Sequence, residues 1–270
     1  MLSINPSDAR KYLLEDPCSL YVQSKINPKK LQRDGWGIGF YENGRPIIIK
    51  SEKPVYTEHE KFSLTVHRAK SKMILAHIRR ASNPRGLPRE KIISEENSQP
   101  FSFGKYIFAH NGTINIPDEV AEFLGEWGKH IRGLNDSEVY FWFIMKELSS
   151  GIDLPSALRK FEETLEDLWR EVHERHPDKN RPYVGLNSII CDGEILYAYC
   201  RYEGNKRASR SLCFGDQPVF EMSYFVDEER LVIASEKTNR EEAWRSLRSG
   251  ELLIGRIVEN RITVEIKKLR

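Results

Sequence analysis

The sequence His110-Asn111-Gly112 contains the residue types that stabilise a developing oxyanion. It follows the short apolar run 106–109, so a strand would deliver it to a surface cleft. The Asn111 side-chain amide and the Gly112 backbone N–H are two donors that could lie about 3 Å from a new negative charge. Glycine also lets the backbone approach a ligand closely. Because Asn-Gly is a common turn dipeptide, the same residues are also typical of a plain turn.

Two charged residues could bind the two ends of an amino acid. Arg79 ends an apolar run, and its guanidinium could clamp a carboxylate through two parallel hydrogen bonds. Arg80 would point the other way, because neighbouring residues of a strand alternate faces. Asp136 precedes a helical pattern and could hold an ammonium group. A surface salt bridge for Arg79 and a helix N-cap for Asp136 are the simpler alternatives, and Ser137 and Glu138 could share the cap.

Other patterns exclude several kinds of site. The alternating glycines of Asp34–Phe40 leave one strand face bare, but no helix follows and the GxGxxG spacing of a phosphate-binding loop is absent. His77 and His110 lie on apolar runs, and no HExxH pattern occurs, so we expect packed or supporting histidines and no metal or cofactor. The basic segment from Arg79 to Lys91 has no aromatic residues for stacking on bases, which favours a solvated or substrate-covering loop over a nucleic-acid site.

Composition sets the class of protein. The chain has 270 residues, of which 39% are hydrophobic and 30% charged, and its net charge is +2. This balance suits a globular protein and gives no overall attraction to nucleic acid or membranes. No apolar stretch approaches the roughly 20 residues of a membrane span, and the first residues lack a secretory apolar core, so we expect a cytoplasmic protein. The Glu, Lys and Arg content suggests a thermophile. None of the four cysteines forms a CxxC pair, and we expect Cys191 and Cys200 to be buried.

Hydrophobic periodicity and turn residues predict the elements that must position these groups. Helices are expected at 7–15, 118–127, 137–148 and 155–173. Strands are expected at 36–41, 46–50, 72–78, 106–109, 184–191, 194–201, 219–226, 231–234, 252–258 and 261–266, with a loop at 83–97. The hairpins predict mostly antiparallel sheets, and two sheets that must both be covered predict an α+β fold with four α/β/β/α layers. Without a linker or repeat, we expect a single domain over residues 1–270.

In this order and spacing, the motifs resemble the class II glutamine amidotransferases, which have the N-terminal-nucleophile (Ntn) hydrolase fold. The resemblance is carried by Asp34–Tyr41, His77–Ser82, Asn97–Phe101 and His110–Gly112, and less sharply by Val232–Glu236. The chain is similar to the stand-alone branch that includes γ-glutamyl hydrolases of ergothioneine or glutathione metabolism.

The resemblance implies a role for each site residue. Arg79 would bind the α-carboxylate of glutamine or a γ-glutamyl compound, and Asp136 would hold its α-ammonium. Asn111 and Gly112 would form the oxyanion hole, with His110 at the same substrate site. The reaction would pass through a γ-glutamyl thioester and release ammonia or an amine. A chain of 270 residues leaves no room for a synthase domain, so ammonia would be released or handed to a separate subunit. The rival is a non-catalytic protein that binds a γ-glutamyl metabolite or bridges a partner.

One departure from the family concerns the nucleophile. Members begin, after removal of the initiator methionine, with a cysteine in a first strand, and its own α-amino group acts as the general base. Here Leu2 takes that position, Ser3 is not terminal, and Cys18 lies too far along the chain. The segment before Ser7 looks too short for the strand and a turn. Either the start codon is misassigned and the cysteine lies upstream, or a natural member lost its nucleophile; retention of the binding residues favours the first.

Overall fold

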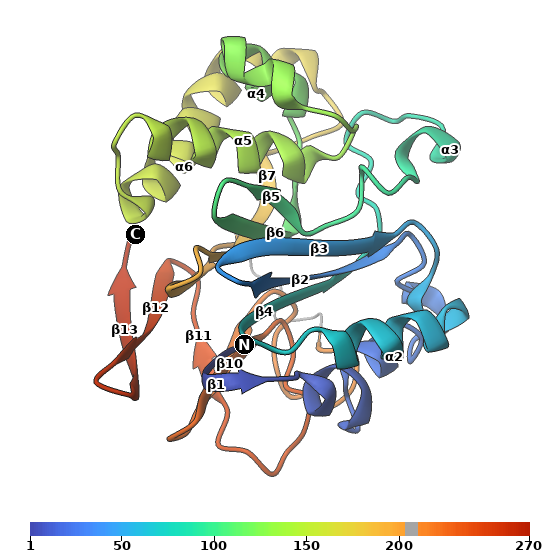
Figure 1. Cartoon of the computed structure of the whole chain (residues 1–270). Helices are drawn as coiled ribbons and strands as arrows, with labels where there is room; N and C mark the ends of the chain where they lie inside the picture. Colours follow the sequence, from blue (N-terminus) through green and yellow to red (C-terminus); the bar gives the residue numbers. More distant parts are fainter. Residues whose placement is uncertain (203–209) are drawn as a thin grey trace.

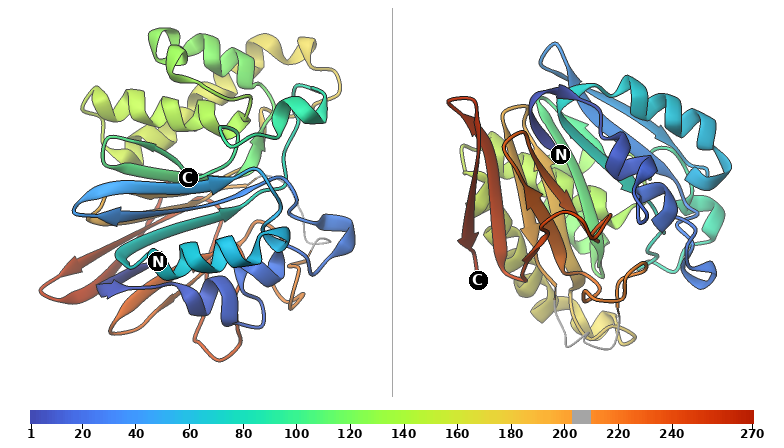
Figure 2. Two further views of the ribbon diagram at one scale, coloured as in Figure 1. Left: turned by 45° about the vertical axis from the view of Figure 1, so that its right-hand side comes forward. Right: turned by 90° about the horizontal axis from the view of Figure 1, so that it is seen from below.

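The computed structural model describes residues 1–202 and 210–270. It contains two antiparallel sheets packed face to face, with helices on both outer faces (Figure 1). Figure 2 shows the same stacking from two other directions. This is the α+β fold with four α/β/β/α layers that the sequence predicts. Within the described residues, no helix combines the length and apolar character that crossing a bilayer requires.

The first sheet combines strands from the first and last thirds of the chain. Its order is β11 (Arg245–Leu247), β9 (Met222–Val226), β10 (Arg230–Ala234), β1 (Leu2–Ser7), β4 (Ser71–Ile78), β2 (Trp36–Glu42) and β3 (Arg45–Ser51). The β2–β3 hairpin turns at Asn43 and Gly44, both with positive φ, as Asn-Gly predicts. Strand β1 therefore lies at the centre of the sheet, between β10 and β4.

The second sheet combines four strands from residues 101–200 with two strands from residues 251–268. Its order is β13 (Arg261–Lys268), β12 (Glu251–Val258), β8 (Ile195–Cys200), β7 (Tyr183–Cys191), β6 (Tyr106–Ile114) and β5 (Phe101–Phe103).

The helices divide between the outer faces. The helices over the second sheet are α4 (Pro117–Phe123), α5 (Asp136–Ser149) and α6 (Leu154–Val172), with short 3-10 turns at Gly125–His130 and His173–Arg175. A π-helical turn at Lys11–Glu15, α1 (Leu20–Gln23) and α2 (His59–Arg68) lie beside the first sheet, with 3-10 turns at Pro28–Lys30 and Val55–Thr57. A short α3 (Arg89–Ile92) interrupts the expected loop.

Three hydrophobic clusters correspond to the three interfaces of this sandwich. One joins α4–α6 to the second sheet, one lies between the sheets, and one joins α2 and the N-terminal turns to the first sheet. The middle cluster includes Leu2, Met73 and Leu75, whereas Met1 and Ile74 belong to the outer cluster. Alternation along β1 and β4 thus decides which side chains face the gap between the sheets.

Several sequence predictions were wrong in detail. Residues 7–15 are not one helix: β1 runs to Ser7, and a π-helical turn begins only at Lys11. The segment before Ser7 is therefore long enough for a strand, because it gains partners on both sides. Strands β5 and β11 were not predicted, since each has only three residues and a weak pattern. The helices expected at 137–148 and 155–173 are confirmed as α5 and α6, and Asp153 caps α6 by accepting from the Ser156 N–H. The helix expected at 118–127 exists but ends at Phe123, where a 3-10 turn follows.

Candidate active site

The expected oxyanion residues lie within β6, not beyond its end. The strand continues to Ile114 because β7 pairs with it through the whole motif, with Asn111 opposite Asn187. Asn111 is exposed. A Cβ on Gly112 would overlap the carbonyl oxygen of Gly185 on β7. Glycine is thus required at 112 by close backbone approach, and the plain-turn alternative is wrong.

His110 is held rigidly beneath these donors. Its Nε2 lies 2.9 Å from the Gly185 carbonyl oxygen, and its Nδ1 lies 2.9 Å from the Ser137 hydroxyl. Because a carbonyl can only accept, the proton is on Nε2, and Nδ1 accepts from Ser137. Burial lowers the pKa of His110, so the ring is neutral at neutral pH. This histidine orients the strand and does not have a ring nitrogen free to bind a metal.

Arg79 follows β4 at the edge of the same region. Its Nη1 donates to the carbonyl oxygens of Ile92, at 2.8 Å, and Asp34, at 3.2 Å. The side chain is 4% exposed, whereas Arg80 is exposed to solvent, as strand alternation predicts. Burial lowers the pKa of Arg79, although the nearby carboxylates of Asp34 and Asp136 oppose that shift. The guanidinium is therefore fixed in a buried position and is not a surface salt bridge.

Asp136 is the first residue of α5 and not its N-cap. Asn135 caps the helix, because its side chain accepts from the Ser137 N–H. One carboxylate oxygen of Asp136 accepts from the Ser82 hydroxyl at 2.5 Å, and the other accepts from the Ile114 N–H at 2.8 Å. The carboxylate thus ties the end of β6 to the segment after β4, directly behind the cavity described next.

A cavity of about 470 Å³ brings most of these residues together. Arg79, His110, Asn111 and Gly112 all line it, together with Ser82 and Gln99. Asp136 does not line it, but its neighbours Asn135 and Ser137 do. This volume lies in the range of pockets that bind small molecules. A cation, two amide donors and a nearby carboxylate around one cavity can hold an amino acid and polarise a side-chain carbonyl.

A second, mainly apolar cavity adjoins the first. Ala76, His77, His110 and Asn111 line both of them, so they meet at the level of His77. Met1 and residues 232–234 line the apolar cavity and not the polar one, whereas Ser235 lines both. The Nδ1 of His77 is buried and has no hydrogen-bond partner among the described residues, and burial lowers the pKa of His77 to about 3. A neutral imidazole therefore stands where the two cavities join.

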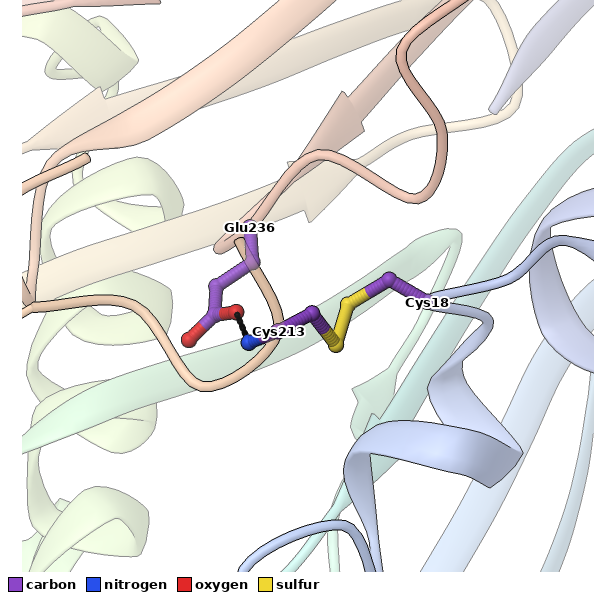
Figure 3. A group of neighbouring side chains, drawn as sticks. All are labelled: Cys18, Cys213 and Glu236. Carbon is purple, nitrogen blue, oxygen red and sulfur yellow. Dashed lines mark hydrogen bonds between the residues drawn. A yellow bond between two sulfur atoms is a disulfide. The ribbon is translucent and has the colours of Figure 1, made fainter. Parts of the chain in front are cut away.

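A disulfide closes one side of the site. Cys18 and Cys213 are bonded across 195 positions of sequence, and a Glu236 carboxylate oxygen accepts from the Cys213 backbone N–H (Figure 3). The other Glu236 oxygen accepts from the Leu212 backbone N–H. Leu212 and Glu236 line the polar cavity. The sequence did not predict this bond, because nothing in cysteine spacing brings positions 18 and 213 together. Cys191 and Cys200 are buried free thiols, as expected.

The two cysteines and Glu236 also form the closest group of potential metal ligands in the described part of the chain. Their sulfurs are bonded to each other and the carboxylate is held by backbone N–H groups, so in this state they offer no ligand set.

Comparison with known proteins identifies the family. A sequence model of the class II glutamine amidotransferases matches residues 21–269. The chain belongs to the class II glutamine amidotransferases. A glutamine aminotransferase class-II domain protein from Silicibacter pomeroyi superimposes with a TM-score of 0.58 at 18% identity, covering 85% of this chain and 90% of that one. The fold is therefore that of the Ntn amidotransferases.

Two curated relatives are similar in sequence over different extents. The uncharacterized protein MJ1515 of Methanocaldococcus jannaschii is 28% identical over 238 residues, which cover 82% of this chain and 60% of that protein. The gamma-glutamyl-hercynylcysteine sulfoxide hydrolase of Mycolicibacterium smegmatis is 30% identical over 115 residues, covering 41% of this chain and 48% of the enzyme. The amidotransferase chain thus spans only part of the length of these relatives.

Sequence reasoning did not single out several residues of the site. Ser82 and Gln99 lie inside the motifs His77–Ser82 and Asn97–Phe101, but their hydrogen bonds to Asp136 and His110 depend on contacts between distant segments. Nothing in the sequence indicated a role for Gly185, because its carbonyl reaches His110 only when β7 pairs with β6.

Proposed function

We propose that this protein hydrolyses the side-chain amide of glutamine or of a γ-glutamyl compound through a γ-glutamyl thioester. The observation that carries the proposal is the single cavity that gathers Arg79, Asn111 and Gly112, with Asp136 directly behind it. Arg79 would bind the α-carboxylate, and Asp136 would attract the α-ammonium. Asn111 and Gly112 would donate to the carbonyl oxygen as it becomes an oxyanion, an interaction that strengthens in the transition state.

The apolar cavity indicates where the attacking group would enter. Met1 pairs with Ile74, since its ammonium donates to the Ile74 carbonyl at 2.7 Å and its carbonyl accepts from the Ile74 N–H at 3.0 Å. Strand β4 continues past this pair to Ile78, and β10 continues past its pairing with Leu2 to Ala234. Between them lies the cavity. A segment that continued β1 upstream would fill this space as a strand.

Register places that segment relative to the site. Counting back from the pairing of Leu2 with Met73, the third residue before Met1 would lie opposite His77 and the fifth opposite Arg79. Because side chains alternate between the two faces of a strand, both residues would point to the same side as Leu2, into the gap between the sheets. We infer that a cysteine at one of these two positions supplies the thiolate. Its terminal amine would act as base.

The test is to determine the native N-terminus by mass spectrometry and to express the reading frame extended upstream. We expect a mature terminal cysteine. We also expect release of ammonia from L-glutamine, or of the free amine from a γ-glutamyl peptide, and this release should disappear when that cysteine is replaced by serine. A native protein that begins Met1-Leu2, binds L-glutamate and releases no ammonia would instead be a non-catalytic metabolite-binding protein. A separate ammonia-accepting subunit is part of the proposal only if ammonia release depends on a co-purified partner.

A further inference from the structure

Gln99 occupies an unusual place beside the expected oxyanion donors. Strands β5 and β6 pair with Phe101 opposite Phe108, so the same register would put residue 99 opposite His110. The chain cannot continue this ladder through Pro100, which has no backbone N–H. Instead the Gln99 side chain replaces a strand partner: Oε1 accepts from the His110 N–H at 2.6 Å, and Nε2 donates to the His110 carbonyl at 3.0 Å.

The turn that holds Gln99 is itself fixed by the bare face of β2. A Cβ on Gly37 would overlap the Gln99 carbonyl oxygen and lie 3.0 Å from Pro100 Cδ. A Cβ on Gly39 would lie 3.1 Å from Pro100 Cγ. The alternating glycines therefore let the turn pack directly on the first sheet. Gln99 is 3% exposed as a result, so losing its hydrogen bonds would leave buried backbone groups of His110 without these partners.

Gln99 also connects β6 to the start of α5. Its Nε2 lies 3.2 Å from the Ser137 hydroxyl, which in turn donates to His110 Nδ1. Two residues earlier, the Asn97 carbonyl accepts from the Asn135 side chain at 2.6 Å. One turn thus holds both the backbone before Asn111 and the helix that begins with Asp136.

We propose that Gln99 is a positioning residue, which holds the His110 backbone so that the Asn111 and Gly112 donors point at the substrate carbonyl. It acts through His110 and not by contact with the reacting atoms. If β5 were longer, its backbone could pair with His110, but it would not also reach the Ser137 hydroxyl as the Gln99 side chain does. The kinetic part of this inference rests on the proposed hydrolysis, whereas the structural part does not.

The test compares Gln99→Met, which keeps the side-chain length without hydrogen bonding, with Ser71→Ala. Ser71 is a matched control because its buried hydroxyl also bridges the N–H and carbonyl of one residue, Tyr41, at the far end of β4. In Gln99→Met we expect amide hydrogen exchange at His110 to accelerate at least tenfold. In the cysteine-containing enzyme we expect kcat to fall about 100-fold with KM within about threefold, since only transition-state stabilisation is lost. Ser71→Ala should change neither quantity.

A further variant separates the two halves of the interaction. Gln99→Glu keeps an acceptor for the His110 N–H but cannot donate when ionised, so its kcat should lie between wild type and Gln99→Met and rise as the carboxyl protonates. Unchanged exchange at His110 in Gln99→Met overturns the inference, and so does altered exchange with wild-type kcat. If the wild-type enzyme releases neither ammonia from L-glutamine nor the amine from a γ-glutamyl peptide, the proposed function fails and exchange at His110 alone decides whether Gln99 holds this backbone.

Discussion

Replacing Arg79 by alanine tests the assignment of the substrate carboxylate most directly. The guanidinium is buried, its Nη1 is held by two carbonyl oxygens, and it lines the polar cavity. A carboxylate bound there would receive charge-assisted hydrogen bonds, each worth about 1.5–3 kcal/mol. Loss of two such bonds, discounted for non-additivity to about 3–4 kcal/mol in total, lowers affinity about 100- to 1000-fold.

The measurement is calorimetric titration with L-glutamate, made on variants whose thermal unfolding has been checked. Arg79→Ala also leaves the Asp34 and Ile92 carbonyls without their donor, which costs about 1–3 kcal/mol of folding stability. Arg79→Lys keeps the charge without the planar fork and should lose less affinity than Arg79→Ala. Arg45→Ala is the control, because this arginine is exposed at the start of β3 and does not line the polar cavity. Wild-type affinity in a folded Arg79→Ala protein would refute the assigned role.

Three further outcomes follow from the geometry. Gly112→Ala should destabilise the protein and abolish hydrolysis, because the new Cβ overlaps the Gly185 carbonyl; a well-folded, active variant in a melting assay would contradict this. Burial lowers the pKa of His77 to about 3 in the folded protein, against 6.5 in the unfolded chain, so the stability linked to its neutral form is complete above pH 6.5 and declines as the pH falls toward 3. In urea titrations, the free energy of unfolding of His77→Leu should therefore fall less steeply with acid than that of the wild type, by up to about 1.4 kcal/mol per pH unit. Reducing the Cys18–Cys213 bond should lower the free energy of unfolding by about 3–5 kcal/mol, because the bond closes a loop of 195 positions; an unchanged denaturation midpoint in Cys18→Ser would argue against it.

The layers of the fold were largely predictable because each depends on local periodicity. Strand alternation and the Asn43-Gly44 turn predict the β2–β3 hairpin, and the capped amphipathic pattern predicts α6. The ends of elements were harder, since pairing with a neighbour decides them. Strand β6 extends through Gly112 only because β7 runs beside it, and β1 exists only because β10 and β4 accept it from both sides.

By itself, the sequence indicated which chemical groups a substrate site could use: a guanidinium at 79, amide donors at 111 and 112, and a carboxylate at 136. Only the tertiary structure decided that three of them line one cavity while Asp136 stands behind it, bound to Ser82 and Ile114. The apolar cavity beside Met1 and the bond between Cys18 and Cys213 also became apparent only in the tertiary structure. The physical reason is that residue type is a local property, whereas proximity between residues far apart in the chain arises from packing two sheets together.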